Sequence, residues 1–167
     1  ADPFAFQNEL FSNLLGREVE IFKKTEPVMK IENGQAEFLL SQGNPEDILY
    51  GYVDSWITEL QLFIDGTYRC NYATWLSEKV FSAGYGSQDH TVTLTNYTGT
   101  EQEIFPHFYF LDMDVFQEVI EELKNKEMHT EIFEDGYVKG TYESGSEGYL
   151  LLSVPYDEGW SASVNGE

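Results

Sequence analysis

The stretch YLLLSVPYDEGW, residues 149–160, decides the fold that this sequence predicts. Its first six residues include one polar side chain, Ser153, so both faces of the strand that they predict favour burial. Pro155 has no amide hydrogen to donate and should end the strand. We therefore expect residues 149–154 to form a central, buried strand around which the other strands stack.

Alternating segments through the rest of the chain predict further strands. Four dipeptides typical of two-residue hairpin turns separate several of them: Asn33-Gly34, Asp65-Gly66, Asp135-Gly136 and Asn165-Gly166. The expected strands are 28–31, 36–40, 48–53, 60–64, 68–72, 79–83, 90–94 and 104–110. Segment 104–110 is apolar on both faces, so we expect it to pair beside the strand that begins at Tyr149.

The clearest hairpin surrounds Asp65-Gly66. The residues that alternate on its two sides are Leu60, Leu62 and Ile64, and then Tyr68, Cys70 and Tyr72. This register places Cys70 on an apolar face, where a thiol normally packs as an inert side chain.

Two segments have helical periodicity. Asp2 can cap the first helix and Pro3 suits its first turn, and its apolar stripe is Phe6, Leu10, Phe11, Leu14 and Leu15. The second helix, near 114–126, should bury Val115, Phe116, Val119, Ile120 and Leu123. Together with the strands, these helices predict a mainly β fold: one jelly-roll-like β-sandwich domain over residues 1–167, with an N-terminal helix and one amphipathic helix.

The composition excludes some partners. Thirty acidic residues against nine basic ones give a net charge of −21, so nucleic acid, which needs clustered Lys and Arg, is not expected as a partner. The single cysteine excludes an internal disulfide. Since no segment approaches 18 consecutive apolar residues, we expect the chain itself to be soluble, with any membrane attachment outside it.

No stretch of the sequence fits a motif for catalysis or metal binding. Asp112-Met113-Asp114 resembles a calcium loop or the Asp-x-Asp of nucleotide-sugar transferases, but Asp114 followed by Gln117 fits a helix cap better. The three histidines lack zinc spacing, and no nucleophile elbow is present. We therefore predict no catalytic residue, no metal site and no cofactor within this chain.

Aromatic residues in polar loops are the best candidates for a binding site. These are Trp56, Trp75, Tyr85 and Tyr97, whose flat rings are able to stack on sugars if they are exposed. The alternative, that they pack in the core or at its rim, stays open, because tryptophans are mostly buried.

The order of residues around the last predicted strand resembles a family signature. Val-Pro-Tyr-Asp-Glu-Gly-Trp followed by Ser-Val-Asn-Gly is similar to the C-terminal signature of YfhO-family bacterial membrane proteins; the residues that carry it are Pro155, Tyr156, Asp157, Gly159 and Trp160. We expect Trp160 to close one end of the sandwich. Upstream segments such as residues 90–96 and 110–112 also resemble the family.

The resemblance implies a function. It implies the extracytoplasmic domain of a polytopic membrane protein, itself similar to glycosyltransferases that use lipid-linked sugars to decorate cell-surface polymers. The parent would lie in the cell membrane with this domain on the extracellular side, non-catalytic and in contact with a cell-surface glycopolymer. Only Glu167 follows Asn165-Gly166, so we expect a domain truncated at its last hairpin.

Two other classes stay open. A free-standing glycoside hydrolase needs two carboxyl groups roughly 5–10 Å apart in a cleft. A protein-interaction module would instead use an exposed edge strand.

Overall fold

The structure is a computed structural model that describes residues 2–32, 35–54, 60–72, 80–96, 106–143 and 149–166. In this part of the chain, two helices and eleven strands form a four-stranded, a five-stranded and a two-stranded sheet. The elements in chain order are α1 (Pro3–Leu15), β1 (Phe22–Thr25), β2 (Val28–Glu32), β3 (Gln35–Leu40), β4 (Ile48–Val53), β5 (Leu60–Ile64), β6 (Thr67–Tyr72), β7 (Val80–Tyr85), β8 (His90–Asn96), β9 (Pro106–Leu111), α2 (Met113–Lys124), β10 (His129–Glu134) and β11 (Tyr137–Thr141).

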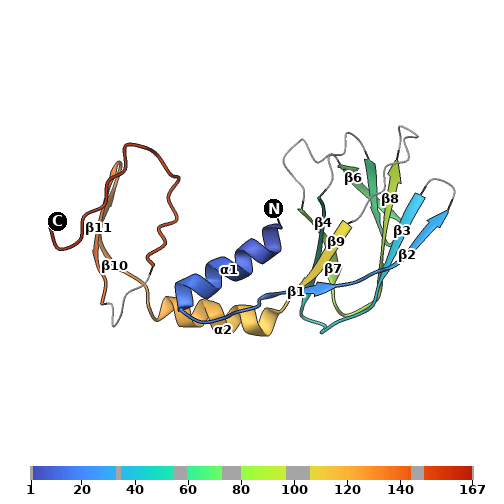
Figure 1. Cartoon of the computed structure of the whole chain (residues 1–167), viewed down its shortest axis with the longest axis horizontal. Coiled ribbons are helices and arrows are strands. Elements are labelled where there is room, and N and C mark those ends of the chain that lie inside the picture. Colours follow the sequence, from blue (N-terminus) through green and yellow to red (C-terminus); the bar gives the residue numbers. More distant parts are fainter. Residues whose placement is uncertain are drawn as a thin grey trace.

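The two larger sheets face each other as the layers of a sandwich (Figure 1). The strand order is β1-β9-β4-β7 in one layer and β2-β3-β8-β5-β6 in the other, with antiparallel neighbours throughout. Alternate side chains of both layers point inward and form the main core, which includes Phe38 and Leu94 of one sheet and Leu49 and Phe108 of the other. The predicted β-sandwich is confirmed.

The hairpins follow the turn dipeptides. Asp65 and Gly66 both have positive φ, 51° and 72°, as a type I′ turn between β5 and β6 requires. Strands β2 and β3 pair as neighbours, while the predicted turn Asn33-Gly34 between them lies outside the described residues; β10 pairs with β11 around Asp135-Gly136. Asn165 and Gly166 also have positive φ, but no strand follows them in the described residues.

The N-cap of α2 lies two residues before the predicted one. Asp112, not Asp114, is the N-cap: its backbone is extended, and its carboxylate accepts a hydrogen bond from the Val115 amide at 3.0 Å. Asp114 lies inside the first turn, where its charge meets the positive end of the helix dipole. The prediction missed this because two acidic residues with a similar capping spacing flank Met113.

Both helices pack against the outer side of the four-stranded sheet. Val119 of α2 is buried with Leu15, Val19, Ile21 and Leu111. Phe4 of α1, rather than the predicted Phe6, enters an aromatic cluster with Tyr52 and Tyr109, while Phe6 is exposed. The cap at Asp2 sets the rotation of α1, because its carboxylate also accepts a hydrogen bond from the Tyr109 hydroxyl.

The prediction of a central strand at residues 149–154 is wrong. These residues form no strand, and Tyr149 is 73% exposed, followed by three exposed leucines. The central positions of the four-stranded sheet belong to β9 and β4, and β9 lies between β1 and β4. Apolar composition shows that a segment favours burial, but it does not identify the sheet that buries it.

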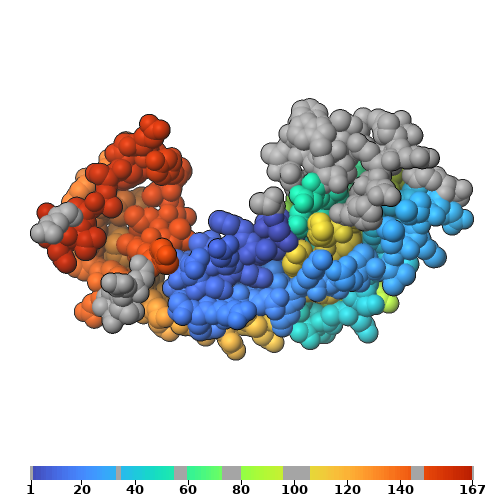
Figure 2. All heavy atoms as spheres, viewed as in Figure 1, coloured from blue at the N-terminus to red at the C-terminus, as the bar shows by residue number. Residues whose placement is uncertain are grey.

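The C-terminal part of the chain forms a separate lobe. The β10–β11 hairpin and residues 149–166 lie beyond α2, at the opposite end of the molecule from the sandwich (Figures 1 and 2). Residues 161–164, which alternate in polarity as a strand would, form no strand there either. Trp160 therefore closes no end of the sandwich, and its side chain is 42% exposed.

Candidate functional site

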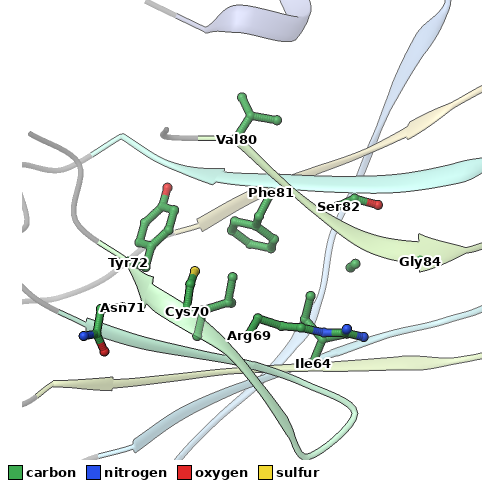
Figure 3. A pocket seen from close by; sticks show the side chains of 11 residues that line it. Ile64, Arg69, Cys70, Asn71, Tyr72, Val80, Phe81, Ser82 and Gly84 are labelled. Carbon is green, nitrogen blue, oxygen red and sulfur yellow. The ribbon is translucent and has the colours of Figure 1, made fainter. Parts of the chain in front are cut away.

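A groove of about 530 Å³ runs between β6 and β7 (Figure 3). Among the described strands, β6 is the outermost strand of the five-stranded sheet and β7 is the outermost strand of the four-stranded sheet. An outermost strand leaves half of its backbone donors and acceptors outside the ladder, so polar backbone groups border the groove on both sides.

The groove has an apolar floor and a polar rim. The floor is formed by side chains of both layers: Leu62, Ile64, Phe81 and Ala83. In Figure 3, Cys70 of β6 points toward Phe81 of β7, whereas Asn71 points away from the groove. Arg69 and Ser82 supply polar side chains to its lining. A groove with this lining suits an extended ligand that has both polar and apolar faces.

Arg69 gives the groove a local positive charge. Within the described part of the chain it forms no ion pair, and no acidic residue of that part lines the groove. In a chain of net charge −21, such a site is unusual. Its guanidinium offers several hydrogen-bond donors in a plane, which suits ligand hydroxyl or carboxylate oxygens.

Tyr85 lies at the end of β7, next to the groove residue Gly84, and is 61% exposed. Its carbonyl oxygen lies 2.8 Å from Nε2 of the buried His90, and Nδ1 of the same ring lies 2.9 Å from a carboxylate oxygen of Asp65. A carbonyl and a carboxylate both accept hydrogen bonds, so the ring satisfies both contacts when both nitrogens carry hydrogen. This bridge fixes the backbone that presents the Tyr85 ring.

Asp65 anchors the other end of this bridge. Burial alone would raise the pKa of its carboxyl group, but hydrogen bonds from the Thr91 amide and from His90 outweigh that effect and lower the pKa. The ionised carboxylate therefore connects the β5–β6 turn to the start of β8 and to the end of β7.

The buried carboxylates of the described residues, Asp47 and Asp112, have structural partners. Asp47 accepts a hydrogen bond from the Met113 amide, and Asp112 forms a 2.6 Å ion pair with Lys23 in addition to capping α2. Burial raises the pKa of Asp112, but the hydrogen bonds from Lys23 and from the helix start more than offset this and lower it. A general acid needs the opposite shift, so Asp112 does not suit that role.

The described residues contain no group of three or more His, Cys, Asp or Glu side chains able to hold a metal ion. In the same part of the chain, no helix has the length and apolarity needed to cross a bilayer.

The predicted binding residues are only partly visible. Tyr85 is exposed and follows the lining residue Gly84, while Trp56, Trp75 and Tyr97 lie outside the described residues. The signature residues from Pro155 to Trp160 lie in the exposed C-terminal lobe, away from the groove.

Cys70 lies on the predicted apolar face, opposite the buried Leu62, because the pairing of β6 with β5 shifts register between Leu62 and Phe63. It is nevertheless exposed and lines the groove, because β6 is an outermost strand. Sequence reasoning missed Arg69 and Ser82 as groove residues, since a groove between two sheets depends on which strands are outermost. Gly84 beside an aromatic residue was the available signal for the exposed Tyr85.

Comparison with known proteins places the chain. Neither the curated proteins nor the solved structures contain a match to it. A family model described as "Bacterial membrane protein YfhO" matches residues 5–167, which is nearly the whole sequence. The chain therefore belongs to the YfhO family of bacterial membrane proteins.

Proposed function

We propose that this chain is a non-catalytic, extracytoplasmic domain of a polytopic YfhO-family protein, and that it binds a cell-surface glycopolymer. The parent, on this proposal, resembles membrane glycosyltransferases that use lipid-linked sugars, and its catalytic carboxylates lie in its membrane part. The domain holds the acceptor polymer on the extracellular side.

The observation that carries the binding role is the groove between β6 and β7. It is long and open, with backbone groups along its borders, an apolar floor and the Arg69 and Ser82 side chains in its lining. Tyr85, the residue after the lining residue Gly84, offers an exposed aromatic ring. Sugar rings combine hydroxyl groups with apolar faces, and both find partners here.

The charge distribution favours a neutral or weakly anionic glycan. A polyanion would meet the repulsion of a chain with net charge −21, although Arg69 offsets it locally. The lowered pKa of Asp112 and the structural contacts of Asp47 support a binding role over hydrolysis.

A glycan array of bacterial surface polysaccharides, followed by NMR titration of the 167-residue chain with the best binder, tests the proposal. We expect the largest shifts at Arg69, Ser82 and Tyr85. Tyr85→Ala and Arg69→Ala should each weaken binding about tenfold, equivalent to ~1.4 kcal/mol. Tyr137→Ala is the matched control, because Tyr137 is an exposed tyrosine of the distant β11 strand. An array without binders, or equal effects of all three substitutions, would contradict the proposal.

The competing glycoside-hydrolase hypothesis makes a different prediction. It requires release of reducing ends from a glycan by the purified chain, with loss of that activity when one carboxylate is replaced by its amide. Detection of such release would replace the binding proposal.

A further inference from the structure

Two apolar surfaces of this chain are uncovered, and they lie at opposite ends of the molecule (Figure 1). One is residues 149–154, here called the C-terminal segment. Its sequence is typical of a β-strand, but it pairs with no described strand. The other is β2, the outermost strand of the five-stranded sheet on the side away from β6. Exposed strand edges with large apolar side chains are normally covered in native assemblies.

Strand β2 has exposed apolar side chains on the inward face of the sheet. Met29 and Ile31 pair with Phe38 and Ala36 of β3, so they share this face, yet Ile31 is 71% exposed. The opposite layer has one strand fewer and does not cover them. The outer face carries Lys30 and Glu32 beside Val28. A strand that covers this edge must therefore be apolar on its inward face.

The C-terminal segment meets that requirement. Leu150, Leu152 and Val154 would share one face of a strand, and Tyr149 and Leu151 the other. Four of its residues, 151–154, can lie opposite residues 29–32 of β2, and Pro155 then ends the pairing.

The segment also lacks charge, which matters for a chain with net charge −21. Residues 149–156 contain no ionisable acid or base at neutral pH other than tyrosine hydroxyls, and β2 carries Lys30 and Glu32, which offset each other. Contact between the two strands therefore adds no like-charge pair. The remaining long-range repulsion is screened by salt.

A bilayer is a poorer partner for this segment. Its backbone amides and carbonyls lack ladder partners, and hydrocarbon cannot supply any, whereas a strand edge can. The β2 edge of the same molecule is also out of position, because α2 holds the C-terminal lobe at the far end from β2 (Figures 1 and 2).

We propose that the C-terminal segment of one copy adds to the β2 edge of a second copy as an antiparallel strand. Placing Leu152 opposite Ile31 and Val154 opposite Met29 buries the apolar inward face, and it sets Ser153 opposite Lys30 on the outer face. Each copy has one donor segment and one acceptor edge, so the contact is head-to-tail and builds oligomers with rising concentration. This association is independent of the groove between β6 and β7.

Disulfide trapping in the 167-residue chain tests the register. In a Cys70→Ser background, Ile31→Cys and Leu152→Cys are made as separate proteins, mixed in equal amounts and oxidised. A disulfide between positions 31 and 152, identified by mass spectrometry, should form at least tenfold faster than one between 31 and 151 in a matched mixture with Leu151→Cys. The side chain of residue 151 points to the opposite face of a strand and is at least as exposed as that of residue 152, so it is a suitable control.

Sedimentation velocity supplies the second measurement. The unmodified chain should associate more strongly as NaCl rises from 20 to 300 mM, and Ile31→Lys should abolish this while leaving the circular dichroism and melting temperature unchanged. Equal trapping at 151 and 152, or a monomer at millimolar concentration, overturns the proposal. The proposal is also overturned if the chain pellets with phosphatidylcholine vesicles and the 31–152 disulfide does not form. That result would assign the segment to a bilayer surface.

Discussion

Gly84 lies directly against the imidazole ring of His90. A Cβ added at residue 84 would lie 2.7 Å from Cε1 of that ring. The backbone of Gly84 also has a φ of 133°, which residues with a side chain rarely adopt. This close approach lets His90 reach the Tyr85 carbonyl and the Asp65 carboxylate at the same time.

Gly84→Ala should therefore destabilise the fold by about 2–4 kcal/mol, because it adds backbone strain and a clash with a buried ring. Urea unfolding measures this loss. Gly136→Ala is the control: it also has positive φ, but no atom lies within 4 Å of the added Cβ, so strain alone should cost about 1–2 kcal/mol. Equal losses would show that the contact with His90 is unimportant.

The cap of α2 gives a prediction that separates two neighbouring aspartates. Asp112→Ala should lower the free energy of unfolding by about 1–2 kcal/mol, since it removes the cap on Val115 and the partner of the half-exposed Lys23. Asp114→Ala should change it by less than about 0.5 kcal/mol, because Asp114 is exposed. Thermal unfolding of both variants is the measurement. If Asp114→Ala were the more destabilising of the two, Asp114 would be the cap, as the sequence predicted.

Tryptophan 160 is a test of the corrected fold. A strand and turn that closed the sandwich would make Trp160→Ala cost about 3–5 kcal/mol. With the residue in the exposed lobe, we expect a loss below about 1 kcal/mol. Phe108→Ala, in the centre of the core, should show the large loss instead. Similar melting temperatures for the two variants would contradict the structure.

Acid should destabilise the chain through three carboxylates. The pKa values of Asp2, Asp65 and Asp112 are each lowered in the fold: burial opposes the shift, and hydrogen bonds to the ionised groups outweigh it. Their contribution is therefore complete above the pKa of the unfolded chain, about 4, and is lost as pH falls through the lower folded values. We expect the melting temperature to fall steeply below pH 4, and Asp65→Asn to flatten that dependence. If the melting temperature of Asp65→Asn depended on pH as steeply as that of the unmodified chain, Asp65 would not contribute to the acid sensitivity.

Local patterns predicted most of the sandwich. The Asp65-Gly66 turn fixes the β5–β6 hairpin through positive φ at both residues, and the stripe around Val119 places α2. Such features depend on neighbours in sequence. By contrast, the outermost positions of β2, β6 and β7 depend on the order of strands from distant parts of the chain, so the groove was not predicted. The short β1 strand was missed for the same reason, because it exists through its pairing with β9.

The mistake at residues 149–154 has a related cause. The segment was assigned to the middle of the sheet because it is apolar on both faces, yet β9, with Phe108 and Tyr109 buried, occupies a central position. Two segments with similar composition differ in whether a partner sheet lies within reach.

The carboxylate of Asp2 joins the beginning of the chain to a sheet strand: it receives the first free amides of α1 and the hydroxyl of Tyr109 in β9. The first helical turn cannot fray without also releasing a tyrosine from the sheet. The first amide hydrogens of α1 should therefore exchange with solvent more slowly than those of a helix start that lacks such a cap.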